Sequence, residues 1–368
     1  MNTDREFRIA VKSSFILSVV LLVMLLPALP ASAHIPLMAG GNENISSAMR
    51  ITDPAKSWAV YGSLERNDVH YYSFDLDEGE RIYLSLFKSS DAKEKNFLPA
   101  LALIGPGLKT AEMPARQLSL PPQASGLKIL AAEGKRAINA TYEPFGPSSF
   151  IEIAEINISA PESARYYAAV YSNANVINNS INSINDLNGA LGHYGLAVGY
   201  REEFSFSDRI ATPLRLISVY LWEGQSLGMI FIPYLVAEIL ALLLFWRGSR
   251  RTSFCLAGSL AGFLFLATSA SVFNQMVFSL TRAPFGAEVY ITVAIAVFHA
   301  ILGVAGIRLA RGEAGILQRA LLAVLGTLAL LAGSGMIMGP ILAMAASFLP
   351  SKSGSIFGKR TARAEEKD

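Results

Sequence analysis

The sequence of 368 residues contains little cysteine and little charge. Its single cysteine, Cys255, excludes an intramolecular disulfide framework and a zinc site built on paired cysteines. Charged residues make up 16% of the chain, against about 25% in globular domains. The deficit is concentrated after Leu214. A net charge of +2, without a basic stripe and interleaved aromatic residues, gives no indication of nucleic-acid binding.

Residues 1–33 have the three parts of a secretory signal peptide. The basic residues at its start are Arg5, Arg8 and Lys12. The apolar run Phe15–Leu26 follows, and Ala31-Ser32-Ala33 fits the small-x-small cleavage rule. Cleavage after Ala33 makes His34 the first mature residue. The alternative is an uncleaved anchor helix, which the apolar run disfavours because a membrane span needs about 20 residues.

Residues 34–205 are predicted to form an extracytoplasmic all-β domain. Val69–Leu76 alternates with period two, and a turn at Asp77–Glu80 leads into a second alternating run from Ile82. This pattern predicts a hairpin in which Gly79 supplies the unusual backbone angles of the turn. Further strand candidates span residues 98–104, 148–158, 166–171 and 194–200. Because helical periodicity is absent, we expect an antiparallel β-sandwich with long polar loops.

The strand pattern also carries a resemblance to a known family. The run Tyr72-x-Phe74-x-Leu76-x-x-Gly79-Glu80-x-Ile82-x-Leu84-x-Leu86 resembles the first hairpin of bacterial pre-peptidase C-terminal (PPC-type) domains. Pro99-x-Leu101-x-Leu103 with Gly105-Pro106-Gly107 is similar to their next strand. Tyr166-Tyr167-x-x-Val170-Tyr171 and Tyr194-x-Leu196-x-Val198 look like their closing pair of strands. The resemblance covers about residues 58–200, with an insertion between about 108 and 147, and implies a jelly-roll-like accessory module. The whole chain also resembles uncharacterised exported membrane proteins of prokaryotes, especially archaea.

Four Asn-x-Ser/Thr sequons lie in the predicted outer domain, at Asn44, Asn139, Asn157 and Asn178. In a host that glycosylates exported proteins these asparagines are candidate glycosylation sites, which would make the protein a glycoprotein. The alternative is that they arise by chance in an asparagine-rich domain.

Residues 206–226 predict an interfacial or pre-membrane helix, with Ser207-Asp208 as its N-terminal cap and Trp222 as an aromatic membrane anchor. The alternative is a single longer helix that starts near Pro213. The membrane region 227–349 is predicted to hold four spans, at about 227–246, 254–277, 289–307 and 320–348. The arginines after the first span mark a cytoplasmic loop by the positive-inside rule: Arg247, Arg250 and Arg251. We therefore expect a multi-pass plasma-membrane protein with its β domain outside.

The polar tail, residues 350–368, conflicts with this topology. Four spans would carry its basic residues outside, where the positive-inside rule disfavours them. Either the tail is an exception or the last apolar segment re-enters the membrane without crossing it. We favour four spans, the fourth tilted or kinked at Gly339-Pro340.

Two ionisable residues, Glu238 and His299, lie deep in the first and third predicted spans at nearly the same depth. A charge at the bilayer centre costs at least about 2.5 kcal/mol, so such residues usually face a partner or a cavity. One interpretation is a hydrogen bond that joins two helices. The second is a relay for protons or ions, and the third is that the two side chains do not contact each other.

A copper site is a further hypothesis. With a free α-amine, His34 could chelate copper through two nitrogens, and a second imidazole would complete a nitrogen site. The arrangement resembles the N-terminal histidine brace of exported copper proteins and lytic polysaccharide monooxygenases. His70 and His193 are the candidate second ligands. The alternative is that a histidine follows the cleavage site by accident.

The sequence favours a non-enzymatic envelope protein whose outer β-sandwich binds a partner protein or a polysaccharide, while its helices contact membrane lipid. A copper-binding exported protein using His34, and a small transport component using Glu238 and His299, are the alternatives.

Overall fold

The computed structural model describes residues 34–65, 68–109, 127–134, 139–172, 191–248 and 252–350. The chain divides into two compact units. We call Ala33–Ile230 together with Val272–Val293 the β unit, and Phe231–Ser271 together with the chain from Ala294 onward the helical unit. The predicted signal peptide and the residues after 350 lie outside the described residues.

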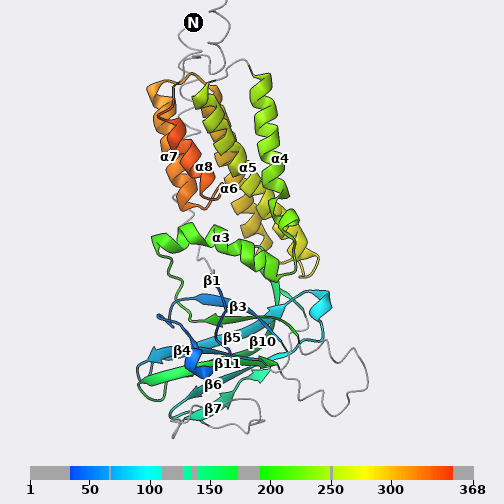
Figure 1. Ribbon diagram of the computed structural model, residues 1–368, viewed down its shortest axis with the longest axis vertical. Coiled ribbons are helices and arrows are strands. Elements are labelled where there is room, and N and C mark those ends of the chain that lie inside the picture. Colours follow the sequence, from blue (N-terminus) through cyan, green and yellow to red (C-terminus); the bar gives the residue numbers. More distant parts are fainter. Residues whose placement is uncertain are drawn as a thin grey trace, which may run out of the picture. The chain divides into compact units, whose positions relative to one another are not determined.

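The β unit contains two sheets (Figure 1). The seven-stranded sheet has the order β1 (Ile35–Met38), β3 (Trp58–Leu64), β12 (Gly192–Val198), β5 (Arg81–Ser89), β10 (Ser148–Ser159) and β8 (Glu133–Gly134), with β9 (Thr141–Glu143) also paired to β10. The five-stranded sheet has the order β2 (Met49–Arg50), β4 (Val69–Leu76), β11 (Ala164–Ser172), β6 (Pro99–Gly105) and β7 (Lys128–Ala131). Two one-turn 3-10 helices, η2 (Ile45–Ser47) and η3 (Ala92–Glu94), lie between strands. The predicted all-β region is confirmed.

The core of the β unit lies between the two sheets. From the seven-stranded sheet, the alternate residues Leu84 and Leu86 of β5 point inward and are completely buried. From the five-stranded sheet, Tyr72 and Phe74 of β4 meet them in the same apolar cluster. The period-two pattern of the sequence therefore assigned the inward and outward faces of these strands correctly.

The predicted hairpin of β4 and β5 is wrong. The turn Asp77–Glu80 forms, with Gly79 at φ +85°, but it carries the chain from one sheet to the other. β4 pairs with β11 and β2, whereas β5 pairs with β10 and β12. The two strands each bury one face against the other sheet, and alternation alone cannot distinguish that arrangement from a hairpin. The sheets are also not purely antiparallel, because β1 pairs with β3, and β2 with β4, in parallel.

Six α-helices follow the β strands in the described chain: α3 (Phe206–Trp222), α4 (Leu227–Arg247), α5 (Ser253–Leu280), α6 (Val289–Arg311), α7 (Ile316–Leu331) and α8 (Met338–Ala346). Three of them, α4, α5 and α6, are long and apolar enough to cross a membrane. The ends of α5 and α6 and the loop between them belong to the β unit, within Val272–Val293.

The segment predicted as one fourth span is divided between α7 and α8, which lie side by side in the helical unit (Figure 1). Between them the chain turns through left-handed backbone at Gly333, Gly335 and Met336. The two helices are antiparallel, because Arg319 Nη1 near the start of α7 donates to the carbonyl oxygens of Ser347 and Leu349, each at 2.7 Å. The glycines at the turn, rather than the predicted kink at Gly339-Pro340, break the helix.

We expect Leu84→Ala to lower the free energy of unfolding of the β unit by about 2–5 kcal/mol, because it leaves a cavity in a closely packed core. The control is Ser85→Ala, on the opposite face of the same strand, which should change it by less than about 0.5 kcal/mol. Urea unfolding of the detergent-solubilised chain, followed by near-UV circular dichroism, measures both. Equal effects of the two substitutions would contradict the assignment of inner and outer faces.

Candidate functional site

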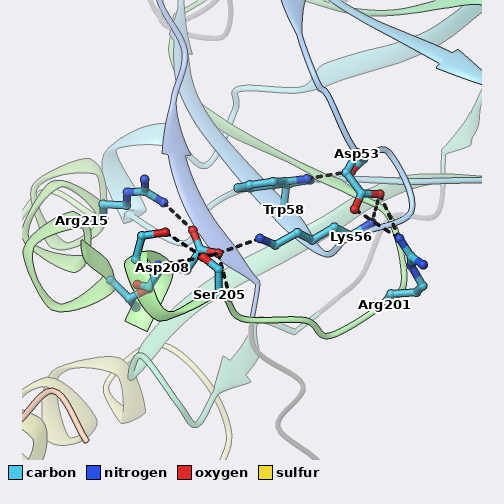
Figure 2. A network of polar contacts seen from close by, with 9 residues as sticks. Asp53, Lys56, Trp58, Arg201, Ser205, Asp208 and Arg215 are labelled. Atoms are coloured by element: carbon cyan, nitrogen blue, oxygen red, sulfur yellow. Dashed lines mark hydrogen bonds and ion pairs between the residues drawn. The ribbon is translucent and has the colours of Figure 1, made fainter. Parts of the chain in front are cut away.

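The N-terminal end of α3 is fixed to the β strands by a network of ion pairs and hydrogen bonds (Figure 2). Ser205 caps the helix, and its hydroxyl and the Asp208 carboxylate form a capping box. Lys56 Nζ lies 2.6 Å from Asp208 Oδ2, and the two side chains are only 14% and 10% exposed. Arg215 approaches the same carboxylate at 3.9 Å. The cap therefore lies at Ser205 and not at the predicted Ser207.

A second carboxylate orders the turn that holds Lys56 (Figure 2). Asp53 Oδ1 accepts a hydrogen bond from the backbone N–H of Lys56, and Arg201 Nη2 donates to both carboxylate oxygens of Asp53 at 3.2 Å. Trp58 Nε1 donates to the Asp53 carbonyl oxygen at 2.9 Å, and the Lys56 ammonium lies 4.7 Å from the centre of the Trp58 ring. These contacts therefore join α3 to the start of β3 and to the segment that follows β12.

Trp222 fixes the other end of α3. Its ring is buried, and its Nε1 lies 3.1 Å from the carbonyl oxygens of both Gly62 and Tyr194. The ring packs edge-on against Tyr61 and Phe87 on the outer face of the seven-stranded sheet. The predicted role of Trp222 as a membrane anchor is therefore wrong, because its side chain is inside the β unit.

Held at both ends, α3 runs along the outer face of the seven-stranded sheet and encloses a cavity of about 160 Å³. Six aromatic side chains line it: Tyr61, Tyr83, Phe87, Phe145, Phe150 and Phe204. α3 contributes Thr212, Leu216 and Val219 to the opposite wall. All of these residues belong to the β unit. The cavity is thus a mostly apolar recess with a few polar groups, which is the usual composition of a ligand site.

Two carboxylates line the cavity, Glu143 on β9 and Glu152 on β10. Neither forms an ion pair with any described residue. The pKa of Glu143 is raised to about 7, mainly by burial and to a smaller extent by Glu202, against the lowering effect of the hydrogen bond from the Phe145 N–H. The carboxyl group of Glu143 consequently changes charge near neutral pH.

His34 also lines the cavity, and it is the one candidate metal ligand that does. Its Nδ1 lies 2.5 Å from Ser57 Oγ. Burial lowers its pKa below the ordinary value of 6.5, so the ring is mainly neutral at pH 7. The imidazole ring of His34 therefore adds no positive charge to the cavity.

The structure does not bring the three candidate copper ligands together. His34 precedes Ile35, which pairs with Trp58 near the start of β3, whereas His193 pairs with Ser63 near its end, roughly 20 Å away along the strand at 3.3 Å per residue. His193 faces outward as predicted and bonds to Glu94 at 2.5 Å. His70 points into the core, where its Nδ1 lies 2.7 Å from the hydroxyl of Tyr194. In the described part of the chain, no three histidine, cysteine or acidic residues cluster as metal ligands would, and copper binding by His34 stays a prediction.

The two candidate intramembrane residues lie on α4 and α6 of the helical unit, and no hydrogen bond joins them. Glu238 Oε1 and His299 Nδ1 are both buried without a hydrogen-bond partner. Their proposed link stays a prediction, as does a role in transport.

Three of the four sequon asparagines are exposed on the β unit: Asn44, Asn139 and Asn157. Asn157 Oδ1 accepts a hydrogen bond from Arg81. Asn178 lies outside the described residues. Glycosylation of these sites stays a prediction.

A second buried carboxylate, Glu223, lies where α3 ends. It is 0% exposed, and it accepts hydrogen bonds from the Ser149 N–H at 2.7 Å and from Gln225 Nε2 at 3.2 Å. Gln225 Nε2 also donates to Gln275 on α5 at 2.6 Å, and Arg282 Nη1 donates to the carbonyl oxygen of Glu223 at 2.9 Å. This cluster attaches β10 and the end of α3 to the end of α5 and to the segment that follows it, within the β unit.

A further contact makes the same connection between β9 and α6. The Tyr142 hydroxyl lies 2.7 Å from Thr292 Oγ1, which donates to the Pro144 carbonyl oxygen at 2.7 Å. Tyr142 packs there in an apolar cluster with Met276 and Val289. The backbone on both sides of Glu143 is therefore held in place, and its carboxylate accepts a hydrogen bond from the Phe145 N–H at 3.1 Å.

Sequence reasoning missed Glu143 and Glu223, because neither has a motif and both are buried only by long-range packing. A sequence match can also mislead, since Gly224–Gly228 fits the Gly-x-Ser-x-Gly pattern of hydrolases. That pattern requires a strand before the serine. Here Ser226 lies between α3 and α4, and its Oγ accepts a hydrogen bond from the Met229 N–H at 3.3 Å. Ser226 therefore lies at the start of α4 and lacks the strand that the hydrolase pattern requires.

Comparisons with known proteins do not assign this chain to a family. No protein-family model matches the chain, and no curated protein is similar to it in sequence. Among solved structures, the chain is similar to the pre-peptidase C-terminal domain of a collagenase from Bacillus anthracis, with 16% identity. The match covers 43% of this chain and 97% of that domain, with a TM-score of 0.21. A likeness this low carries no argument about function, and membership of the PPC-type family stays a prediction.

We expect Glu223→Gln to weaken the pH dependence of stability. Burial raises the pKa of Glu223 from 4.5 to about 7, so the wild-type chain loses up to about 3 kcal/mol of stability as the pH rises from 4.5 past 7. Glutamine carries no charge, retains the acceptor for Ser149, and can donate to Gln225 Oε1, which has no partner. The variant should therefore be the more stable chain at pH 8.

Urea unfolding at pH 5 and pH 8 measures this difference, with Glu155→Gln, an exposed residue of β10, as the control. If the free energy of unfolding changed equally with pH in wild type and in Glu223→Gln, ionisation of the Glu223 carboxyl group would not destabilise the fold, and the prediction would be wrong.

Proposed function

We propose that the protein is a non-enzymatic, membrane-anchored protein of the cell envelope whose β unit binds a partner protein or an envelope polysaccharide. The observation that carries this proposal is the cavity between α3 and the seven-stranded sheet. It combines aromatic walls with two carboxylates that have no cation among the described residues. An unpaired, partly desolvated carboxylate is costly for the fold, so it is more readily explained as part of a ligand site than as part of the core.

The anchoring rests on α4, α5 and α6, the three membrane-length helices. α4 and α6 both end in basic residues, at Arg247 and at Arg308 and Arg311. Because basic residues favour the cytoplasmic side, we assign these ends to the cytoplasm and the β unit to the outside.

The antiparallel course of α7 and α8 supports a re-entrant segment for the last apolar region. Arg319 near the start of α7 contacts the carbonyl oxygens of Ser347 and Leu349, and the Phe254 N–H at the start of α5 lies 3.4 Å from the Pro350 carbonyl oxygen. The segment thus returns to the end of the bundle from which it left. On this assignment three helices cross the membrane, and the basic tail begins on the cytoplasmic side, in agreement with the positive-inside rule.

Single cysteines in a Cys255→Ala background test this topology with a membrane-impermeant thiol reagent. Glu78→Cys, at an exposed turn of the β unit, should react in intact cells. Glu313→Cys, between α6 and α7, and Ser353→Cys in the tail should react only after permeabilisation. Reaction of Ser353→Cys but not Glu313→Cys in intact cells would establish a fourth crossing instead.

Partner binding is tested by purifying the tagged full-length chain from its native envelope in mild detergent. A specific partner should co-purify with wild type and with the control Glu155→Gln, and should be reduced at least tenfold with Glu143→Gln. Tyr83→Ala, which removes an aromatic wall, should reduce it similarly. Recovery of the chain with no component above the level of an untagged strain would reject the proposed function.

A further inference from the structure

We propose that the cavity of the β unit receives the side chain of a lysine that a partner protein presents. This inference rests on the proposed function and commits it to a protein partner. It is argued from the size of the cavity, its aromatic walls and its unpaired carboxylates.

The size of the cavity fits one aliphatic side chain. A volume of about 160 Å³ is close to the 150 Å³ of an engineered protein cavity that binds benzene. A lysine side chain, with a four-carbon stem and one ammonium, has about five non-hydrogen atoms. A sugar ring with all its hydroxyl groups is larger, and it needs more polar partners than this lining offers.

The walls suit both parts of that side chain. The rings of Phe87, Phe145 and Phe150 provide apolar contacts for the methylene groups. Aromatic faces also attract cations through the negative charge of their π electrons. The same sheet face already does so, because the Arg81 guanidinium lies 5.2 Å from the centre of the Tyr83 ring and 4.9 Å from that of Tyr200.

The charge of the cavity favours a cation. Glu143 lies within it and the exposed Glu152 lies at its surface, and neither is paired among the described residues. A third carboxylate acts on this region, Glu202, through its effect on Glu143. Within a recess of low polarity, carboxylates of one sign concentrate the electric field and attract the opposite charge. A bound ammonium would offset the cost of burying Glu143.

A primary ammonium fits better than a quaternary one. Lysine donates three hydrogen bonds, and the lining offers acceptors at Glu143, Ser85 and Ser148. A choline group, as in a lipid headgroup, has no hydrogen to donate and leaves these acceptors unused. The planar guanidinium of arginine is larger and donates in a fixed fork.

The experiment titrates the full-length chain in detergent with Nα-acetyl-lysine N-methylamide. The matched ligand is the norleucine derivative, which has the same stem without the ammonium. Tryptophan fluorescence reports binding, because Trp222 packs 5.0 Å from Tyr61 and 6.0 Å from Phe87, which both line the cavity. We expect the lysine derivative to bind at least tenfold more tightly than the norleucine derivative, and more tightly than choline.

Glu143→Gln should weaken lysine binding at least tenfold, whereas Glu155→Gln, which lies outside the lining, should change it less than twofold. Glutamine retains the acceptor for the Phe145 N–H, and an unchanged urea midpoint confirms that the variant is folded. If Glu143→Gln does not fold, Tyr83→Ala takes its place with the same expected loss. Unchanged lysine affinity in the folded variant would overturn the inference.

The pH dependence gives a further test. The titratable groups around Glu143 are Glu152, Tyr61, Tyr83, His34 and Glu202, and the α3 residues of the lining add none. Because Glu143 must be ionised to attract the ammonium, affinity should fall by about tenfold per pH unit below 7 and level off above it. The dependence should disappear in Glu143→Gln. An affinity that is constant between pH 5.5 and pH 8 would overturn the role of this carboxyl group.

Other occupants have distinct outcomes. If the norleucine derivative binds as tightly as the lysine derivative, the cavity is an apolar recess only. If choline or phosphatidylcholine vesicles bind more tightly than the lysine derivative, the cavity is a lipid site. Either result overturns the lysine proposal. The lysine derivative should also release the co-purified partner. If a partner co-purifies but is not released by it, the lysine inference fails and the proposed function stands. If the derivative binds but no partner co-purifies, the proposed function fails.

Discussion

The ion pair between Lys56 and Asp208 is the contact on which the site depends. It fixes the first turn of α3 to the strands, over the seven-stranded sheet. The pair is largely buried, so breaking one partner leaves an uncompensated charge, which costs about 3–5 kcal/mol in other proteins. The capping box of Ser205 and the order that Asp53 imposes on the turn both set the geometry of this one contact.

The cavity follows from two constraints that oppose each other. Trp222 and the ion pair draw α3 toward the sheet at its two ends, while the large rings between them, such as Tyr61 and Phe150, keep its middle away. Gly195 makes room for one of the cavity's rings, because a Cβ atom there would lie 2.1 Å from the Phe87 ring. The recess is thus made by the fold itself, and the carboxylate of Glu143 is placed in it because Tyr142, its neighbour on β9, is held by Thr292.

The sequence predicts the local features well and the long-range ones poorly. Period-two alternation predicts β4, β5 and β10 and the buried faces of β4 and β5, and apolar runs predict α4, α5 and α6, because both signals depend only on residues close in the chain. The pairing of β4 with β11, about ninety residues away, has no local signal. For the same reason the sequence predicts Trp222 at the membrane interface. An aromatic residue at the end of an amphipathic helix is compatible with the membrane interface and with the interior of a protein. The hydrogen bonds from Trp222 to the carbonyl oxygens of Gly62 and Tyr194 show that it lies inside the β unit. The cavity cannot be predicted from the sequence, because it forms only where α3 packs against the seven-stranded sheet.

The boundary of the β unit also could not be read from composition. The change from mixed to apolar sequence near Leu214 suggests a soluble domain that ends at about residue 205. The compact unit extends further, through α3 and into Val272–Val293. A chain cut at 205 would expose Phe87 and Tyr61, remove the carboxylate that satisfies the Ser149 N–H, and leave Tyr142 without Thr292. The contacts of Glu223 and Tyr142 therefore join strands next to the cavity to the ends of two membrane-length helices within the β unit, which is why composition alone does not mark where this unit ends.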